Sequence, residues 1–310
     1  MIVLAMITMG VTAAERFSEP INRVTYPHDF SWKPVPTWQN GFFLSWDYPE
    51  PVLFMFDSRG RLRNQVTIRI PNAGSIMITH ASASPSGAMA VSGSASSGGA
   101  GAAFIAWIDS GGVTQRVVRT TPFAPYRLYY ASDGTLWVLG RVIDHSATED
   151  SPHDILRHYG ADGTLIRSTL PSDSFSSSSG RHPSSGSFLA GSKALIGVYS
   201  VGRNEWVEVS RESSQITGRW PGVSLASGDK ITGAAITESG SVYVSVKLRQ
   251  HPPTNNVVYR LDRAKESWVP LDATSVVGDK PGRVVTLFGA DGNRLVVGLN
   301  LPDLYWLSEP

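Results

Sequence analysis

The sequence predicts an all-β chain built from a repeated unit of four antiparallel strands. No segment of helical length carries apolar residues at the spacing i, i+3, i+4, i+7 that an amphipathic helix requires. Short runs rich in Val, Ile, Tyr, Phe and Trp dominate instead, for example Val52–Asp57 and Val242–Val246. Gly, Asp, Asn and Ser separate these runs, and these are the residues that form tight turns.

The clearest copy of the unit spans Tyr126–Leu170. It contains two predicted hairpins, which turn at the dipeptides Asp133–Gly134 and Asp162–Gly163. Asp-Gly between apolar runs is a strong hairpin signal, because both positions tolerate a positive φ. Two hairpins in tandem form one four-stranded sheet, which is one blade of a β-propeller.

Weaker copies of the unit fill the rest of the chain. They cover Phe42–Ile70, Ile76–Thr120, Ser187–Trp220, Ile231–Leu271 and Val284–Leu299, the last with a further strand at Leu304–Leu307. A repeat of about 40 to 55 residues has the size of a propeller blade. The chain therefore predicts six blades.

The two ends of the chain predict how the ring closes. The last unit lacks its fourth strand, whereas Arg16–Tyr26 is a predicted strand without a unit of its own. We expect this segment to complete the last blade and to make residues 15–310 a single domain. The Ser- and Gly-rich stretches Ser92–Gly101 and Ser172–Ser187 are predicted to be flexible loops.

The segments Ala131–Val138 and Ile155–Ile166 resemble the inner and outer hairpins of NHL-like and TolB-like six-bladed propellers. This resemblance covers the plan of the repeat, and it implies a propeller. Those propellers include binding scaffolds, lactonases and lyases, so the resemblance leaves the activity open.

The first fourteen residues, Met1–Ala14, form an uncharged apolar run that ends in small residues. Such a run is too short to span a bilayer, and it is typical of a secretory signal peptide. No basic residue precedes Arg16, however, so a buried first strand is the alternative. We expect a secreted or periplasmic protein without a membrane span.

Composition excludes several classes of protein. With 41% hydrophobic and 10% aromatic residues, the 310-residue chain can form a large core. A formal net charge of +1 gives no general attraction to nucleic acid. The chain contains no cysteine, which excludes disulfides, thiolate metal sites and cysteine nucleophiles.

Ligand-binding candidates lie in segments predicted to reach one face of the ring. In a propeller this face carries the connections between blades and the loops between the second and third strands of each blade. Trp38, Trp46, Asp47 and Tyr126 fall there, and their aromatic rings would stack on a sugar or a peptide. Packing between the blades is the alternative role for the aromatic rings.

A second set of candidates is rich in histidine and carboxylates. His145, Asp150 and His153 lie in one predicted loop, and His251 lies in another that faces it. Imidazole and carboxylate groups are ligands of zinc, manganese and calcium, so the first three form a candidate metal site. A plain solvated loop is the alternative.

These observations predict a module that binds a protein, a small molecule or a carbohydrate and requires no cofactor. The alternative is a lactonase-like hydrolase or lyase, with one divalent cation in the central funnel. A structural subunit of an envelope complex is a third possibility. Arg59, Arg61 and Arg63 alternate on one predicted strand, where they would bind an anion or protect a sheet edge.

Overall fold

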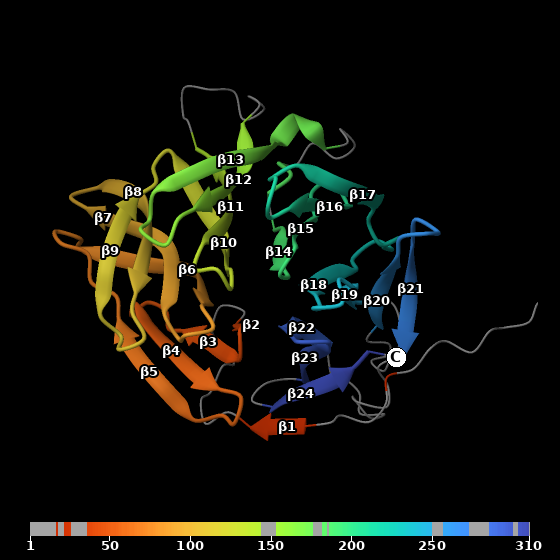
Figure 1. The fold of residues 1–310 in the computed structure, drawn as a ribbon. Coiled ribbons are helices and arrows are strands. Elements are labelled where there is room, and N and C mark those ends of the chain that lie inside the picture. Colours follow the sequence, from red (N-terminus) through yellow and green to blue (C-terminus); the bar gives the residue numbers. More distant parts are fainter. Residues whose placement is uncertain are drawn as a thin grey trace, which may run out of the picture.

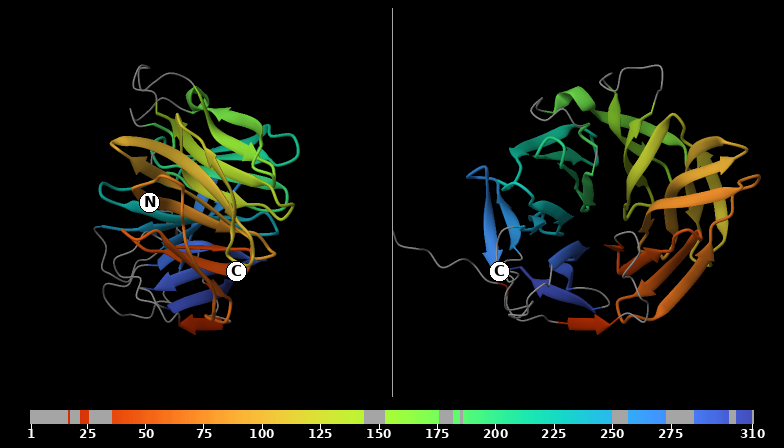
Figure 2. Two further views of the ribbon diagram at one scale, coloured as in Figure 1. Left: turned by 90° about the vertical axis from the view of Figure 1, so that its left-hand side faces the viewer. Right: turned by 180° about the vertical axis from the view of Figure 1, so that it is seen from behind.

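The computed structural model is a ring of six four-stranded antiparallel sheets, which confirms the predicted six-bladed β-propeller (Figure 1). Figure 2 shows the same ring from the side and from behind. The structure describes residues 17, 22–25, 36–143, 153–175, 182–184, 186–249, 257–272, 285–299 and 303–309.

The strands of each blade follow one another in sequence from the centre of the ring outward. Blade 1 contains β2 (Thr37–Gln39), β3 (Phe42–Trp46), β4 (Val52–Asp57) and β5 (Leu62–Thr67). Blade 2 contains β6 (Ser75–Ala83), β7 (Met89–Ser97), β8 (Ala100–Ile108) and β9 (Thr114–Arg119). Blade 3 contains β10 (Phe123–Tyr130), β11 (Leu136–Val142), β12 (Asp154–Tyr159) and β13 (Leu165–Pro171).

The other three blades repeat this plan. Blade 4 contains β14 (Phe188–Gly191), β15 (Leu195–Ser200), β16 (Glu205–Ser210) and β17 (Ile216–Pro221). Blade 5 contains β18 (Lys230–Ile236), β19 (Val242–Lys247), β20 (Val257–Asp262) and β21 (Ser267–Asp272). Blade 6 contains β22 (Val285–Asp291), β23 (Arg294–Leu299), β24 (Asp303–Ser308) and, outermost, β1 (Asn22–Thr25).

The N-terminal strand closes the ring as predicted. β1 pairs antiparallel with β24, and the register runs from Asn22 opposite Trp306 to Thr25 opposite Asp303. The first described strand thus supplies the fourth strand of the last blade, and hydrogen bonds hold the closure in place of a covalent link.

Antiparallel order gives the ring two different faces. The hairpin face carries the turns between the first and second and between the third and fourth strands of each blade. The loop face carries the remaining connections, including those that join one blade to the next. The only helical element in the described ranges, a 3₁₀ turn at Ser172–Ser174, lies in the connection between blades 3 and 4.

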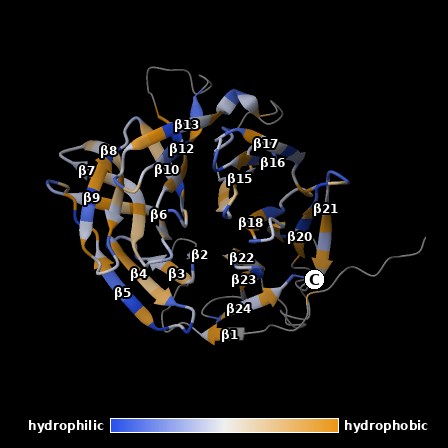
Figure 3. Ribbon diagram, in the orientation of Figure 1, coloured by the Kyte–Doolittle hydropathy of each residue, from blue (hydrophilic) through white to orange (hydrophobic). Residues whose placement is uncertain are grey.

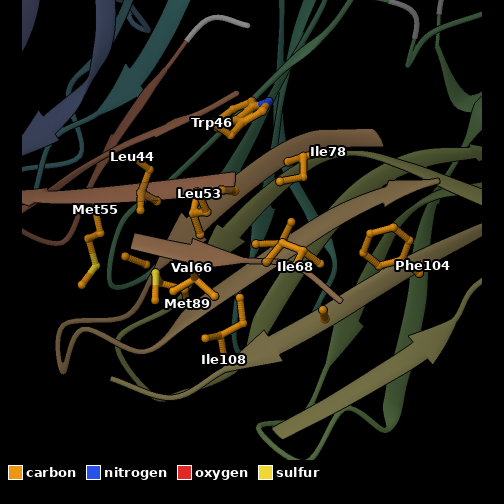
Figure 4. Packing of buried hydrophobic residues seen from close by; sticks show 14 residues of the cluster. Leu44, Trp46, Leu53, Met55, Val66, Ile68, Ile78, Met89, Phe104 and Ile108 are labelled. Atoms are coloured by element: carbon orange, nitrogen blue, oxygen red, sulfur yellow. The ribbon is translucent and has the colours of Figure 1, made fainter. Parts of the chain in front are cut away.

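The hydrophobic core consists of clusters that lie between neighbouring blades. One such cluster, between blades 1 and 2, includes Leu44, Trp46 and Phe104, and Figure 4 shows these side chains packed together. Phe43, next to Leu44 in β3, instead contributes to the cluster between blades 6 and 1. Both faces of a blade are therefore buried, which explains the continuous apolar runs of the sequence.

A β-bulge interrupts four of the innermost strands. The register shifts around Thr79 in β6, Tyr126 in β10, Thr232 in β18 and Phe288 in β22. Thr79 and Thr232 use their hydroxyls to reach the next blade, donating to the carbonyls of Pro125 and Val285 at 3.2 and 3.4 Å. The bulges thus help to hold consecutive blades together.

A second repeated contact lies at the outer rim. Asn64 of β5 donates to the carbonyl of Ser110 at 2.8 Å, and Arg167 of β13 donates to that of Ser213 at 2.6 Å. Arg116 of β9 makes the same contact with Asp162. Each bond spans 46 residues and links an outer strand to the outer turn of the next blade. Polar and apolar residues share these outer strands, as the two colours on β5 and β9 in Figure 3 show.

One sequence-based expectation for a loop was wrong. Ser92–Gly101 is not a loop, because β7 and β8 continue through it and pair as far as Ser97 and Ala100. Only Gly98 and Gly99 form the turn, with φ of +58° and +85°. Small residues form strands at Ser92–Ser97 because their backbone groups pair with those of β8. The other stretch, Ser172–Ser187, connects blades 3 and 4 without a strand in its described residues, and Ser184 and Ser187 are buried there.

The closure predicts different costs for two glycine substitutions. Gly60, in the outer turn of blade 1, has φ +75°, and an added Cβ would lie 2.8 Å from Val24 Cγ1 of β1. Gly41 has φ +85° and open space at the same position. Both alanine variants carry the left-handed backbone penalty of about 1–2 kcal/mol. We expect Gly60→Ala to lose a further ~1–3 kcal/mol from overpacking, measured by chemical unfolding. Equal losses would contradict tight packing of β1 on this turn.

Candidate functional site at the loop-face opening

A narrow channel runs along the axis of the ring. The innermost strands of all six blades line a central cavity of about 120 Å³. Its wall is uneven. Blades 1 to 3 contribute Gln39, His80, Arg127 and Tyr129, whereas blades 4 to 6 contribute mainly small or apolar residues such as Ala190.

The channel opens on the loop face into a second hollow of about 260 Å³, which we call the opening. Its lining consists of Thr79, Tyr126, Arg127, Arg141, Ser184, Gly186 and Ser187. Arg127 also lines the central cavity, so it stands where the opening meets the channel. A hollow of this size has room for several water molecules or for a small organic molecule.

Two bulged strands place side chains at the opening. Thr79 and Tyr126 are the extra residues of the bulges in β6 and β10, and Arg127 directly follows Tyr126. A bulge turns the side chains beside it away from the regular alternation of a strand. Arg141 lies on β11, and its neighbour Gly140 pairs with Pro125 of β10.

Arg127 holds a positive charge in a partly buried place. Burial lowers the pKa of its guanidinium from the usual value. The guanidinium lies 5.6 Å from the centre of the Phe188 ring and donates a bond of 3.3 Å to the carbonyl of Tyr126. Among the described residues, no aspartate or glutamate forms an ion pair with it. Such a charge is costly without a counter-ion.

Arg141 provides a second cation beside it. Its guanidinium carbon lies 6.0 Å from the centre of the Tyr126 ring. The Nε atom is buried, and within the described ranges it has no hydrogen-bond acceptor. Burial raises the pKa of the Tyr126 hydroxyl, although the charge and hydrogen bonding of Arg141 oppose this effect. Tyr126 therefore keeps its proton at neutral pH.

His80 completes the wall just inside the channel. Its Nδ1 accepts the backbone N–H of Leu128 at 3.2 Å, which places its own proton on Nε2. Burial, and next the positive charge of Arg127, hold the pKa of His80 well below its ordinary value. His80 is therefore neutral at pH 7.

The other end of the channel has a different character. A hollow of about 170 Å³ on the hairpin face is lined by Lys193, Glu238, Asp291 and neighbouring residues. Lys193 and Glu238 form an ion pair at 3.4 Å. Charges of both signs lie at this end, whereas the described lining of the opening carries positive charge alone.

The structure separates the predicted ligand-binding residues. Tyr126 lies at the opening as expected. Trp38 and Trp46 are 3% and 1% exposed and pack between blades, which is the alternative role of these rings. Trp38 meets Trp306 edge-on at 5.1 Å, and Trp46 meets His80 at 5.8 Å. Asp47 is partly buried and lies just after β3 on the loop face, away from the residues of the opening.

Of the predicted histidines, His153 is described and supports the opening indirectly. Its Nε2 accepts the backbone N–H of Val142 at 3.1 Å, and its ring stacks on His182 at 4.9 Å. His182 in turn contacts Ser184, a residue of the opening. His145, Asp150 and His251 lie outside the described residues. The metal site that includes the first two stays a prediction.

Within the described ranges, no three histidine or carboxylate side chains gather in the way that a metal site requires. Helical structure there is also too short to cross a membrane.

Sequence reasoning missed Arg127, Arg141 and Thr79. The signal was the position of the arginines in the innermost hairpin of the clearest repeat, where a side chain has only the channel or the core beside it. A charged residue in such a strand is unusual enough to mark a candidate site.

Comparisons with known proteins identify the fold alone. No family model and no curated protein matches the chain. The fold is similar to that of a Bacteroides caccae protein of unknown function, with 12% identity, a TM-score of 0.53, and 85% of this chain and 82% of that chain covered. It is also similar to a Bacteroides fragilis NCTC 9343 protein recorded as a "putative exported protein", with 11% identity, a TM-score of 0.54, and 92% and 86% covered. Kuenenia stuttgartiensis hydrazine synthase matches at 11% identity and a TM-score of 0.50, with 94% and 76% covered.

The depressed pKa of His80 predicts a loss of stability in acid. The unfolded chain binds a proton near the ordinary histidine pKa of about 6.5, whereas the folded chain binds it only at lower pH. The free energy of unfolding should therefore fall below about pH 6.5, by up to ~1.4 kcal/mol per pH unit for each such proton. His80→Asn keeps an acceptor for Leu128 and should flatten this slope in urea unfolding curves. His158, whose pKa burial also lowers, should leave a smaller slope. If the free energy of unfolding fell equally with pH in the wild type and in His80→Asn, the loss of stability in acid could not be assigned to His80.

Proposed function

We propose that this β-propeller binds a small anionic ligand at the opening, with Arg127 and Arg141 holding the negative charge. The observation that carries the proposal is the partly buried guanidinium of Arg127, which no carboxylate of the described residues neutralises. Folding places this charge where it is costly, and a bound anion removes that cost.

The surroundings support the same conclusion. The two guanidiniums line one hollow, and a planar guanidinium binds carboxylate or phosphate oxygens through two parallel bonds. The buried Nε of Arg141 is a donor that the described protein leaves without an acceptor.

The proposal extends to the place where the protein works. The apolar run Met1–Ala14 supports export, and a protein of similar fold carries the description of an exported protein. The NHL-like or TolB-like plan of the repeat is compatible with a binding scaffold. A binding module outside the cytoplasm is the function that these features favour.

Thermal melting with simple anions tests the proposal. Acetate, citrate, phosphate and sulfate are compared at equal ionic strength, since a ligand of the native state raises the melting temperature. We expect at least one of them to stabilise the wild type. Arg127→Gln and Arg141→Gln should each weaken that binding by about 10- to 100-fold. Arg119→Gln, which removes an exposed arginine on β9, is the matched control and should change nothing. If all three variants bound the anion as tightly as the wild type does, the proposal would be overturned.

The ligand-free protein gives an independent test. If Arg127 is kept for binding, its replacement by an apolar side chain of similar length removes a charge that no carboxylate of the described residues neutralises. Arg127→Met should then raise the free energy of unfolding by roughly 1–2 kcal/mol while it abolishes stabilisation by anions. A clear loss of stability in this variant would show that the guanidinium serves the fold instead.

A further inference from the structure

The hydroxyl groups at the opening narrow the class of ligand beyond a simple anion. Thr79, Ser184 and Ser187 all line the opening. The two serines are 1% and 2% exposed, so their positions are built into the fold. A hydroxyl has one proton to donate and two lone pairs that accept, and the partners of these three hydroxyls show where each proton goes.

Ser187 and Thr79 donate their protons to the protein. The hydroxyl of Ser187 donates to the carbonyl of Pro183 at 2.6 Å, and that of Thr79 donates to the carbonyl of Pro125 at 3.2 Å. A carbonyl oxygen can only accept, which fixes the direction of both bonds. The Ser92 hydroxyl lies 3.0 Å from that of Thr79, and either of the two can be the donor of this bond, so the Thr79 proton has acceptors within the protein only.

The hydroxyl of Ser184 also donates its proton to the protein. Its backbone N–H donates to Nδ1 of His182 at 3.3 Å, so that nitrogen is an acceptor without a proton. The hydroxyl of Ser184, 2.8 Å from the same Nδ1, must donate to it as well. All three hydroxyl protons are therefore used within the protein, and the described residues leave each of the three oxygens with at least one lone pair that accepts no bond.

From this arrangement we infer that the ligand is a hydroxylated carboxylate of the size of a sugar acid. The two guanidiniums supply donors to its carboxylate, and the three hydroxyl oxygens accept from its own hydroxyl groups. A bare anion such as sulfate satisfies the guanidiniums but brings oxygen lone pairs against oxygen lone pairs. A neutral sugar satisfies the hydroxyls but adds no negative charge beside Arg127, for which the described residues supply no ion-pair partner.

This inference rests on the proposed anion site, and calorimetric titration separates the two. The probes are glucuronate, galacturonate and gluconate, with cyclohexanecarboxylate and hexanoate as acids without hydroxyls and glucose as the neutral sugar. We expect at least one hydroxylated acid to bind about tenfold or more tightly than both plain acids, and glucose to show no binding. Equal affinity for the two kinds of acid would overturn the inference but leave the anion site standing. No binding of any acid would overturn both.

Variants of two hydroxyl residues test whether these residues cause the preference for hydroxylated acids. Ser187→Ala removes one accepting oxygen. Thr79→Val removes another, on β6, with little change in the shape of the side chain. Each variant should bind the hydroxylated acid about fivefold to thirtyfold more weakly than the wild type does, with unchanged affinity for the plain acids. The melting temperature of each ligand-free variant identifies a folding defect, in which case the other variant decides. Uniform weakening of every acid by a well-folded variant would overturn the inference.

Discussion

One extra residue in an innermost strand sets the geometry of both the ring and the channel. At each bulge the strand departs from its regular alternation, and a side chain reaches either the next blade or the axis. Thr232 shows the first outcome, because its hydroxyl contacts Ser245 at 2.7 Å and Val285 of blade 6 at 3.4 Å. Arg127 shows the second, because it lines the channel. The same backbone feature therefore closes blade against blade and shapes the opening.

The residue that follows the bulge differs between two pairs of blades. In blades 5 and 6 it is Gly233 and Gly289, where an added Cβ would lie 2.0 and 2.4 Å from a backbone oxygen of the next blade. In blades 2 and 3 it is His80 and Arg127. Close approach of the backbones leaves room only for glycine at this position in blades 5 and 6. In blades 2 and 3 the same position carries a polar side chain that lines the channel. Apolar clusters between the blades supply stability that offsets the cost of these polar groups.

The sequence predicted the fold well because the relevant signals are local. Asp133–Gly134 and Asp162–Gly163 are turns as expected, and both glycines have positive φ. Burial on both faces of a blade produces apolar runs such as Val52–Asp57, which are visible without any structure. Misassignment of Ser92–Gly101 has a physical cause. Strand pairing there depends on backbone hydrogen bonds, and the serines and glycines that make them resemble a loop in composition.

The site was harder to predict because it depends on register. A bulge adds one residue, and from that point each side chain changes the face on which periodicity would place it. Tyr126 was a candidate through its residue type and lies at the opening, whereas Arg127 reaches the channel beside the register shift. Trp46 packs between blades, because an indole at a strand end suits a binding face and an interblade core equally well.

The closure by β1 also fixes the order in which this protein can be completed. Its partner strand β24 follows every other described strand in the chain, so the pairing of Asn22 with Trp306 joins segments that are far apart in the sequence. Until then blade 6 lacks its outer strand, and the edge of β24 is open to pairing with another chain. Contacts of such long sequence separation form slowly. β1 can therefore take its native place only after the strands of all six blades have been synthesised, so closure of the ring depends on segments near both ends of the described chain.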